Sequence, residues 1–236
     1  MKILVIVPAR SGSVGLKNKN IKVLNNKPLI WWTIRLKKFT SKINYRWILS
    51  TDSKKILNIG KKLGIECPFI RPEILSKSKS TVYEVIKHAL DFFSRENYYP
   101  DLIIWLQPTS PFRHDNLIQD CIKKLKKTGA TSLIGVKNLN RSQSTIYQKS
   151  NKDSFIKPLL YQEKVNTFRQ SDLNNLLTPC GSIYISKTKE FLRFKGFMNH
   201  KKMVFVELDK LASVDIDDQF DWEVAQAFSK NLGKKL

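Results

Sequence analysis

The sequence is poor in cysteine and in acidic residues, and it has no long apolar run. Its three cysteines, Cys67, Cys121 and Cys180, lie far apart without a C-x-x-C spacing, which argues against a disulfide framework or a zinc site. No segment reaches the length of a transmembrane helix, and the apolar run over residues 3–7 is too short for the core of a signal peptide. We therefore expect a soluble, cytoplasmic protein without a membrane partner.

The sequence has fewer than half as many acidic residues as basic ones. The 20 Asp and Glu against 42 Lys and Arg give a formal net charge of +22. This surplus suits polyanionic partners, so an RNA-binding module is one candidate. The lysines are spread along the chain, and the run at residues 123–127 lies where a helix is expected to end and its dipole favours cations. No basic motif is interleaved with aromatic residues. We favour a solvated basic surface and expect no nucleic-acid partner.

Apolar runs alternate with helical patterns along most of the chain. Apolar and β-branched runs predict strands over residues 2–8, 47–50, 67–70, 102–106, 132–137, 181–185 and 203–208. Apolar residues at helical spacing predict helices over 28–39, 54–63, 81–96, 117–128 and 219–231, with Pro28 as a first helical residue and Ser53 as an N-cap. The alternation predicts one α/β domain over residues 1–236, with a mostly parallel central sheet flanked by helices.

The alternation of strand and helix patterns stops between about residues 138 and 179. This stretch is rich in Asn, Ser, Gln and Lys and has no long apolar pattern. A structureless loop of that length is uncommon inside a domain. We therefore expect an inserted arm that leaves the sheet and returns to it.

The first apolar run leads into a loop of small and basic residues. Its glycines let a backbone approach an anion, its serines add hydroxyl donors, and its basic side chains bring positive charge. The residues concerned are Ala9, Arg10, Ser11, Gly12, Ser13, Gly15, Lys17, Lys19 and Asn20. The pattern favours a triphosphate site, with an ordinary glycine turn as the alternative. The spacing fits neither the Walker nor the dinucleotide-binding pattern.

Polar segments follow four of the expected strands, at residues 10–20, 51–52, 107–113 and 215–219. Ligands of a parallel sheet bind beyond the carboxyl ends of its strands, so these segments should meet. Asp215 and Asp217 share a face if the backbone is extended. Two carboxylates suit Mg²⁺ completed by phosphate oxygens and water. The alternative is an acidic helix cap, with Asp218 capping the last helix.

Eight short motifs lie in order along nearly the whole chain, at residues 9–13, 50–53, 71–72, 88–90, 107–113, 169–170, 181–185 and 215–217. Together they resemble the acylneuraminate cytidylyltransferases, also called CMP-sialic acid synthetases. The resemblance implies a nucleotide-sugar transferase-like fold. It implies an Mg²⁺-dependent nucleotidyltransferase that joins CTP to a nine-carbon 2-keto sugar acid (N-acetylneuraminate, legionaminate or pseudaminate), giving a CMP-sugar and pyrophosphate. It also implies a homodimer whose inserted arm lends residues to the neighbour's sugar site.

The resemblance assigns roles to residues of this sequence. Those for the nucleotide are Ala9, Arg10, Ser11, Gly12, Ser13, Gly15, Lys19, Asn20, Arg71 and Ser80. Those for the sugar acid are Gln107, Thr109, Ser110, Arg169, Gln170 and Tyr184. The metal ligands are Asp215 and Asp217, and the catalytic groups are Arg10, Lys19 and Asp217.

Three positions depart from the family's usual pattern. Val14 stands where a lysine usually faces the phosphates, Cys180 replaces an asparagine, and Ser78 stands where an aspartate is common. A valine supplies no ammonium charge, so a catalytically lapsed nucleotide-binding homologue is the alternative to an active enzyme. We expect Lys17 or Lys19 to compensate, because Asp215, Asp217, Gln107 and Arg169 all remain.

Overall fold

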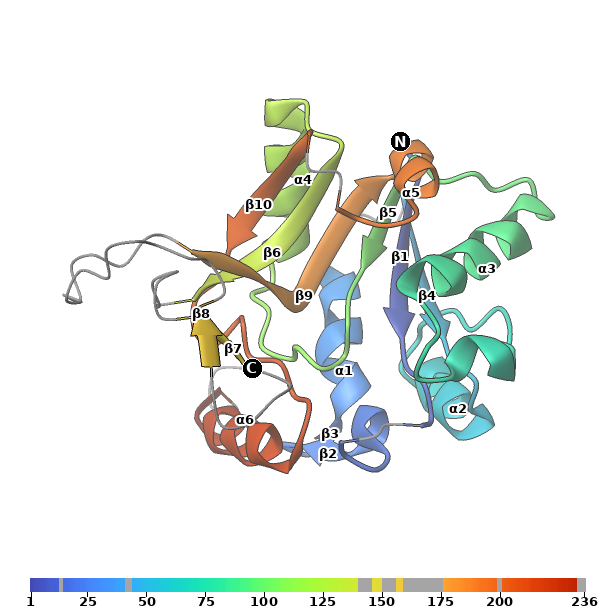
Figure 1. Cartoon of the computed structure of the whole chain (residues 1–236). Coiled ribbons are helices and arrows are strands. Elements are labelled where there is room, and N and C mark those ends of the chain that lie inside the picture. Colours follow the sequence, from blue (N-terminus) through green and yellow to red (C-terminus); the bar gives the residue numbers. More distant parts are fainter. Residues whose placement is uncertain are drawn as a thin grey trace.

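The structure, a computed structural model, describes residues 1–12, 15–40, 44–139, 146–149, 156–158, 176–198 and 201–232. Its centre is a six-stranded sheet in the order β10-β6-β9-β5-β1-β4 (Figure 1). The strands are β1 (Ile3–Pro8), β4 (Tyr45–Ser50), β5 (Leu102–Trp105), β6 (Ser132–Asn138), β9 (Leu177–Lys187) and β10 (Met203–Glu207). Neighbouring strands are parallel, except that β9 runs antiparallel to β5 and β6. The mostly parallel sheet is confirmed.

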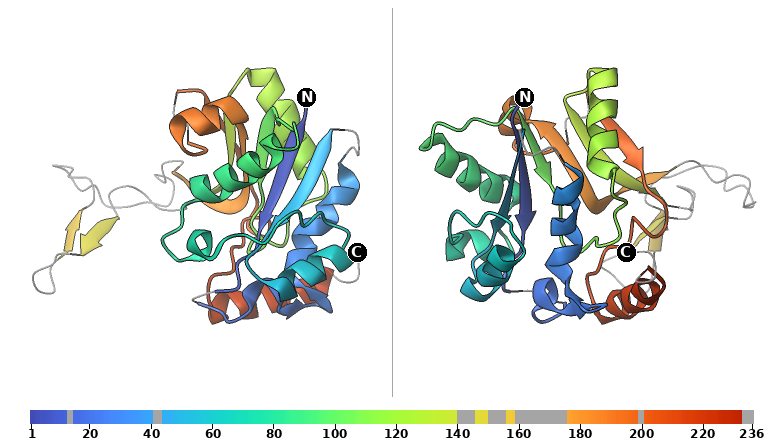
Figure 2. Two further views of the ribbon diagram at one scale, coloured as in Figure 1. Left: turned by 90° about the vertical axis from the view of Figure 1, so that its right-hand side faces the viewer. Right: turned by 180° about the vertical axis from the view of Figure 1, so that it is seen from behind.

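Helices cover both faces of the sheet, as the alternation of patterns predicts (Figures 1 and 2). The odd-numbered residues of β1 face a core shared with α1 (Leu29–Ile34), α2 (Lys54–Lys62) and α4 (Leu117–Thr128). The even-numbered residues face a second core with α3 (Val82–Ser94) and α5 (Thr188–Phe194). Because side chains alternate along a strand, a continuous apolar run fills both cores at once.

A third core lies beyond the carboxyl ends of β1 and β5, where α6 (Gln219–Leu232) packs at the lower end of the sheet in Figure 1. Here Trp32 of α1 and Trp222 of α6 are buried together with Ile216. The indole N–H of Trp32 donates to the carbonyl of Leu24, at 3.2 Å. The 3-10 turn η1 (Lys19–Ile21) and the hairpin of β2 (Val23–Leu24) and β3 (Lys27–Pro28) complete this end of the molecule.

Two predicted elements are wrong in detail. The helix expected over 28–39 is α1 followed by the 3-10 turn η2 (Arg35–Phe39), and Pro28 is extended just before it. Residues 67–70 form no strand; instead Glu66 makes an isolated bridge to Ile48, and Pro68 has no N–H to continue the ladder. The chain then runs through the 3-10 turn η3 (Glu73–Ser76) to α3.

The predicted arm begins and ends at adjacent positions of the sheet. Asn138 at the end of β6 is paired with Leu177 at the start of β9. Between them β7 (Tyr147–Lys149) and β8 (Ile156–Pro158) form an antiparallel pair. Most of the arm lies outside the described residues, so its role stays a prediction. Among the helices that the structure describes, none has the length and apolarity needed to span a bilayer.

A capping box starts α3 and fixes Thr81 beside the cavity described below. The Thr81 hydroxyl accepts from the N–H of Glu84 at 3.2 Å, and the Glu84 carboxylate accepts from the N–H of Thr81 at 2.7 Å. The carboxylate also accepts from the Thr81 hydroxyl at 2.9 Å. The bond from the backbone N–H of Thr81, and after it the bond from the hydroxyl, favour the charged carboxylate and lower the pKa of Glu84.

Glu84→Gln should therefore destabilise the protein in a pH-dependent way. A lowered folded-state pKa gives stability that is present above the unfolded-state pKa and is lost as the pH falls through the folded-state value. We expect the variant to melt below the wild type at pH 7, and the gap to close as the pH falls below the ordinary pKa of a glutamate and through the lowered folded-state pKa. Thermal unfolding between pH 3 and pH 7 measures this, and a gap independent of pH would contradict it.

Candidate active site

A cavity of about 670 Å³, here called the central cavity, opens where β1 and β5 end at Pro8 and Trp105. The predicted site residues that line it are Arg10, Gly15, Lys19, Asn20, Arg71, Ser80, Gln107, Thr109, Asp215 and Asp217. Apart from Arg71 and Ser80, they come from three of the four polar segments expected to meet, at residues 10–20, 107–113 and 215–219. The fourth segment does not line this cavity; its Asp52 binds Ser11 beside it. The chemical roles of the lining residues stay predictions.

The remaining predicted residues do not line the central cavity or lie outside the described residues. Tyr184 lines a second cavity of about 440 Å³, which shares Trp105 and Gln107 with the first. Ala9 and Ser110 are buried, and Ser11 and Gly12 lie at a separate hollow beside Asp52. Ser13, Arg169 and Gln170, as well as Val14, lie outside the described residues.

The loop after β1 is held by its neighbours at both ends. Ser11 donates its N–H and its hydroxyl to the Asp52 carboxylate, at 2.8 and 2.6 Å, and the Asn20 amide donates to the carbonyl of Arg10 at 2.9 Å. A Cβ at Gly15 would lie 2.3 Å from the carbonyl oxygen of Asp217. Gly15 is therefore required for the close approach of two backbone segments, and its contact with an anion stays a prediction.

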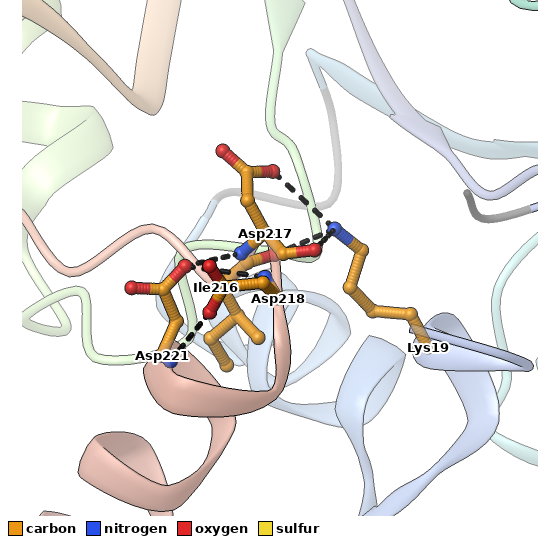
Figure 3. A network of polar contacts seen from close by, with 5 residues as sticks. All are labelled: Lys19, Ile216, Asp217, Asp218 and Asp221. Carbon is orange, nitrogen blue, oxygen red and sulfur yellow. Dashed lines mark hydrogen bonds and ion pairs between the residues drawn. The ribbon is translucent and has the colours of Figure 1, made fainter. Parts of the chain in front are cut away.

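The acidic segment before α6 binds Lys19 and caps the helix (Figure 3). The Lys19 ammonium donates to the carbonyl of Ile216 at 2.6 Å and to the Asp217 carboxylate at 3.3 Å. Asp218 accepts from the N–H of Asp221 at 3.0 Å, while Asp221 accepts from the N–H groups of Asp217 and Asp218 at 2.9 and 3.2 Å. Capping by Asp218 is confirmed, and the Asp217 side chain is left 79% exposed at the cavity.

Three oxygen-bearing side chains converge on Gly181. A Cβ there would lie 2.5 Å from Gln107 Oε1, 2.8 Å from Asp215 Oδ2 and 3.0 Å from Ser110 Oγ. The other carboxylate oxygen of Asp215 and the Ser110 hydroxyl are buried and have no hydrogen-bond partner among the described residues. Buried polar atoms are normally paired, so this cluster is suited to receive a cation or a ligand donor.

Arg71 brings a buried guanidinium to the cavity. Its Nε donates to Ser76 Oγ at 3.1 Å, and one terminal nitrogen is buried without a partner in the described part of the chain. Burial lowers the pKa of Arg71, and the charge of Asp52 opposes that shift. Arg71 therefore offers a directed donor for a ligand acceptor.

Sequence reasoning missed several residues of this region. Four residues to which no role was assigned also line the central cavity: Lys77, Thr81, Val82 and Trp105. Their only signal in the sequence is that they lie next to predicted motifs or strands. Arg113 was recognised as part of a motif without a role, although it is buried at 1% exposure behind Gln107. Burial lowers its pKa to about 9, and the negative charge of Asp215 opposes the shift, so the guanidinium remains protonated at neutral pH.

The fold and the cavity define an α/β protein with a phosphate-compatible site at the carboxyl ends of parallel strands. A family model described as Cytidylyltransferase matches residues 4–230, and the chain belongs to this family. It is 30% identical over 226 residues to a CMP-N,N'-diacetyllegionaminic acid synthase of Legionella pneumophila, covering 96% of this chain and 95% of that protein.

Two further comparisons agree with this assignment. The chain is 33% identical over 232 residues to an N-acylneuraminate cytidylyltransferase of Escherichia coli, covering 95% of this chain but only 51% of that protein. The structure of CMP:2-keto-3-deoxy-manno-octonic acid synthetase complexed with CTP superposes with a TM-score of 0.66 at 14% identity, covering 100% of both chains. At that identity the likeness establishes the fold, which confirms the predicted fold class.

Gly181→Ala should displace the oxygen cluster. A Cβ at 2.5 to 2.8 Å from Gln107 and Asp215 forces both side chains to move. We expect cytidylyltransferase turnover to fall about 100-fold, as for a misplacement of reacting groups by about 1 Å.

The matched control is Gly60→Ala in α2. Its Cβ would lie 2.3 Å from the Leu49 side chain, so it strains packing against residues that do not line the central cavity. Turnover per folded molecule, with the folded fraction measured by circular dichroism, should be preserved in this control. Wild-type turnover in Gly181→Ala would show that the cluster is not needed.

Proposed function

We propose that this protein transfers the CMP group of CTP to a nine-carbon 2-keto sugar acid and releases pyrophosphate. The observation that carries this proposal is a central cavity with basic and acidic side chains that shares Gln107 and Trp105 with a second cavity. One cavity is lined by many charged side chains and the other mainly by aromatic and neutral ones, which suits a highly charged triphosphate beside a sugar acid with a single carboxylate. The names of the relatives, which include legionaminic and neuraminic acid enzymes, support the substrate class.

The nucleotide would occupy the central cavity. Arg10 and Arg71 line it, and the unpartnered guanidinium nitrogen of Arg71 would donate to an acceptor of CTP. Asn20 donates to the carbonyl of Arg10 and so holds the backbone of that residue at the cavity. Lys77 adds a positive charge that the motifs did not indicate. These cations offset the negative charge of the triphosphate.

The sugar acid would occupy the second cavity. Gln107 is shared with the nucleotide side, and as a neutral amide it can bond to a sugar without competing for a cation. Burial raises the pKa of Tyr184, so its phenol stays protonated and can donate to a sugar hydroxyl. We assign the sugar's carboxylate to Arg169 of the arm, since a guanidinium binds a carboxylate in a bidentate way.

The residues present fit a Mg²⁺ ion. Asp215 has a buried carboxylate oxygen without a partner in the described part of the chain, and Asp217 presents an exposed carboxylate at the same cavity. Two carboxylates are the usual protein share of a Mg²⁺ site that phosphate oxygens and water complete. Mg²⁺ bound there would neutralise charge on the phosphate oxygens. Lys19 holds the Asp217 carboxylate at the cavity edge.

The reaction requires orientation more than covalent chemistry from the protein. The anomeric hydroxyl oxygen of the sugar acid forms a bond to the α-phosphorus of CTP. The bond from that phosphorus to the bridging oxygen breaks, pyrophosphate leaves, and the hydroxyl proton is released. The chain's part is to align the two substrates and to match the charge that develops on the phosphates.

Pyrophosphate release tests the function. The purified protein is assayed with CTP and Mg²⁺ against N-acetylneuraminate, legionaminate and pseudaminate, with the eight-carbon 3-deoxy-manno-octulosonate as a control. We expect release with at least one nine-carbon acid and a slower reaction with the control. A protein that binds CTP but releases no pyrophosphate with any of them would be a lapsed homologue.

Removing a carboxylate of the acidic pair should impair catalysis. We expect Asp215→Asn or Asp217→Asn to cost roughly 3 kcal/mol of transition-state stabilisation, the scale of one preorganised electrostatic group. Turnover at limiting Mg²⁺ measures the loss. Asp218→Asn is the control, since Asp218 caps α6, and it should change turnover per folded molecule little. Normal turnover in Asp217→Asn would remove that residue from the metal site.

The arm should make a homodimer and complete the sugar site. Its ends meet, because the N–H of Leu139 donates to the carbonyl of Leu176 at 2.7 Å, so a two-residue Asn-Gly turn can replace the residues between them. We expect this deletion to yield a monomer that binds CTP but does not turn over the sugar acid. Light scattering and calorimetry measure both properties. A deletion variant that remains dimeric or stays active would count against this role.

We place the enzyme in a reducing cytoplasm. Cys67, Cys121 and Cys180 are free thiols. Burial raises the pKa of Cys121 to about 12 and also raises that of Cys180, so both thiols stay protonated and unreactive. Free buried thiols fit a compartment in which disulfides are kept reduced.

A further inference from the structure

We propose that Arg113 is a positioning residue for the transfer reaction. It fixes the loop that carries Gln107 and Ser110 against strand β9, so that these side chains and Asp215 converge at Gly181. The kinetic part of this inference rests on the proposed function.

The Arg113 guanidinium uses all five of its N–H donors inside the protein. Within its own loop it donates to the carbonyls of Gln107, at 2.6 Å, and Ser110. From β9 it reaches the carbonyls of Ser182, at 2.5 Å, and Gly181, at 3.4 Å. The fifth bond, at 2.9 Å, goes to the hydroxyl of Thr33 in α1. One side chain thus joins three separate segments of the chain.

The β9 carbonyls are available because the sheet is irregular at this point. The pairing of β9 with β5 ends at Tyr184, and its pairing with β6 shifts between Ile134 and Val136, where β6 resumes opposite Pro179. Residues 180–183 therefore lie between two paired stretches. Their carbonyls need other donors, because a buried carbonyl left unpaired is costly. Arg113 supplies donors to two of them.

Lysine could not take this place. An ammonium has three donors around one atom, whereas the planar guanidinium spreads five donors over a fork that reaches acceptors on different segments. The positive charge of Arg113 also matters, because Asp215 presents its carboxylate at Gly181 and attracts the buried guanidinium. The shape and the charge of the arginine together hold the two segments and balance the acid.

Loss of the Arg113 contacts should affect one substrate more than the other. The oxygen cluster at Gly181 belongs to the sugar and metal side of the site, whereas Arg10 and Arg71 reach the central cavity from other segments. Loosening the 107–113 loop should therefore disturb the second substrate and the chemical step, and it should leave the binding of CTP without metal intact. A residue that only stabilises the fold would give no such division.

The first test uses Arg113→Lys, which keeps the charge but not the fork. We expect kcat/KM for the sugar acid to fall about 100-fold, in line with a small misplacement of reacting groups. The affinity for CTP without Mg²⁺, measured by calorimetry, should be unchanged. Relative to the wild type, hydrogen exchange should become faster in residues 107–113 and 180–184, whereas exchange in α2 should stay the same. Thr33→Val, which removes one acceptor and keeps the side-chain shape, should shift the same quantities less.

Arg46→Lys is the matched control. Arg46 bonds to the carboxylates of Glu66 and Glu96 at the opposite end of the sheet, so its loss should lower the melting temperature without changing kcat/KM per folded molecule. If Arg113→Lys or Thr33→Val behaves like this control, with uniform exchange, the positioning role is wrong. If the wild type releases no pyrophosphate with any nine-carbon acid, the proposed function fails. Hydrogen exchange alone then decides whether Arg113 fixes the loop.

Discussion

The burial of Ile216 is the constraint on which the site depends. Ile216 is fully buried in the third core beside Trp32 and Trp222, and its N–H donates to the carbonyl of Thr109 at 2.8 Å. Burying such a side chain contributes about 1.5 to 3 kcal/mol, enough to fix the register of a short segment. With Ile216 facing the core, its neighbours Asp215 and Asp217 both face the central cavity. The acidic pair is thus positioned by an apolar residue between its members.

Two carboxylates on one short segment repel each other, and the surrounding residues offset that repulsion in different ways. Lys19 binds Asp217 and the carbonyl of Ile216, while the Arg113 guanidinium, which donates to the carbonyl of Gly181, attracts the Asp215 carboxylate. An exposed ion pair contributes little to stability, so Lys19 acts mainly by fixing the backbone through the carbonyl bond. The acidic pair therefore exists within a framework of positive charge before any ligand enters.

The sequence allowed the fold and the outline of the site to be predicted, because both follow from local patterns. Continuous apolar runs marked the buried strands, polar segments marked their carboxyl ends, and the spacing of Asp215 and Asp217 indicated a shared face. Prediction failed where a long-range contact decides. The close approach of Gly15 to Asp217 and the donors of Arg113 to β9 depend on neighbours that no local pattern shows. The strand predicted over 67–70 failed for a local reason, because Pro68 has no N–H for a ladder.

The structure also indicates which basic residues could replace the charge of a lysine at position 14. The Lys19 ammonium already donates to the carbonyls of Ile216 and Asp217 and to the Asp217 carboxylate, which accounts for its three donors. It can reach a triphosphate only by giving up bonds that hold the acidic segment. Compensation by Lys19 would thus weaken the site it serves. Arg10 and Lys77 already line the cavity, and Lys17 is exposed on the same loop, so these residues are better placed to supply the charge that Val14 lacks.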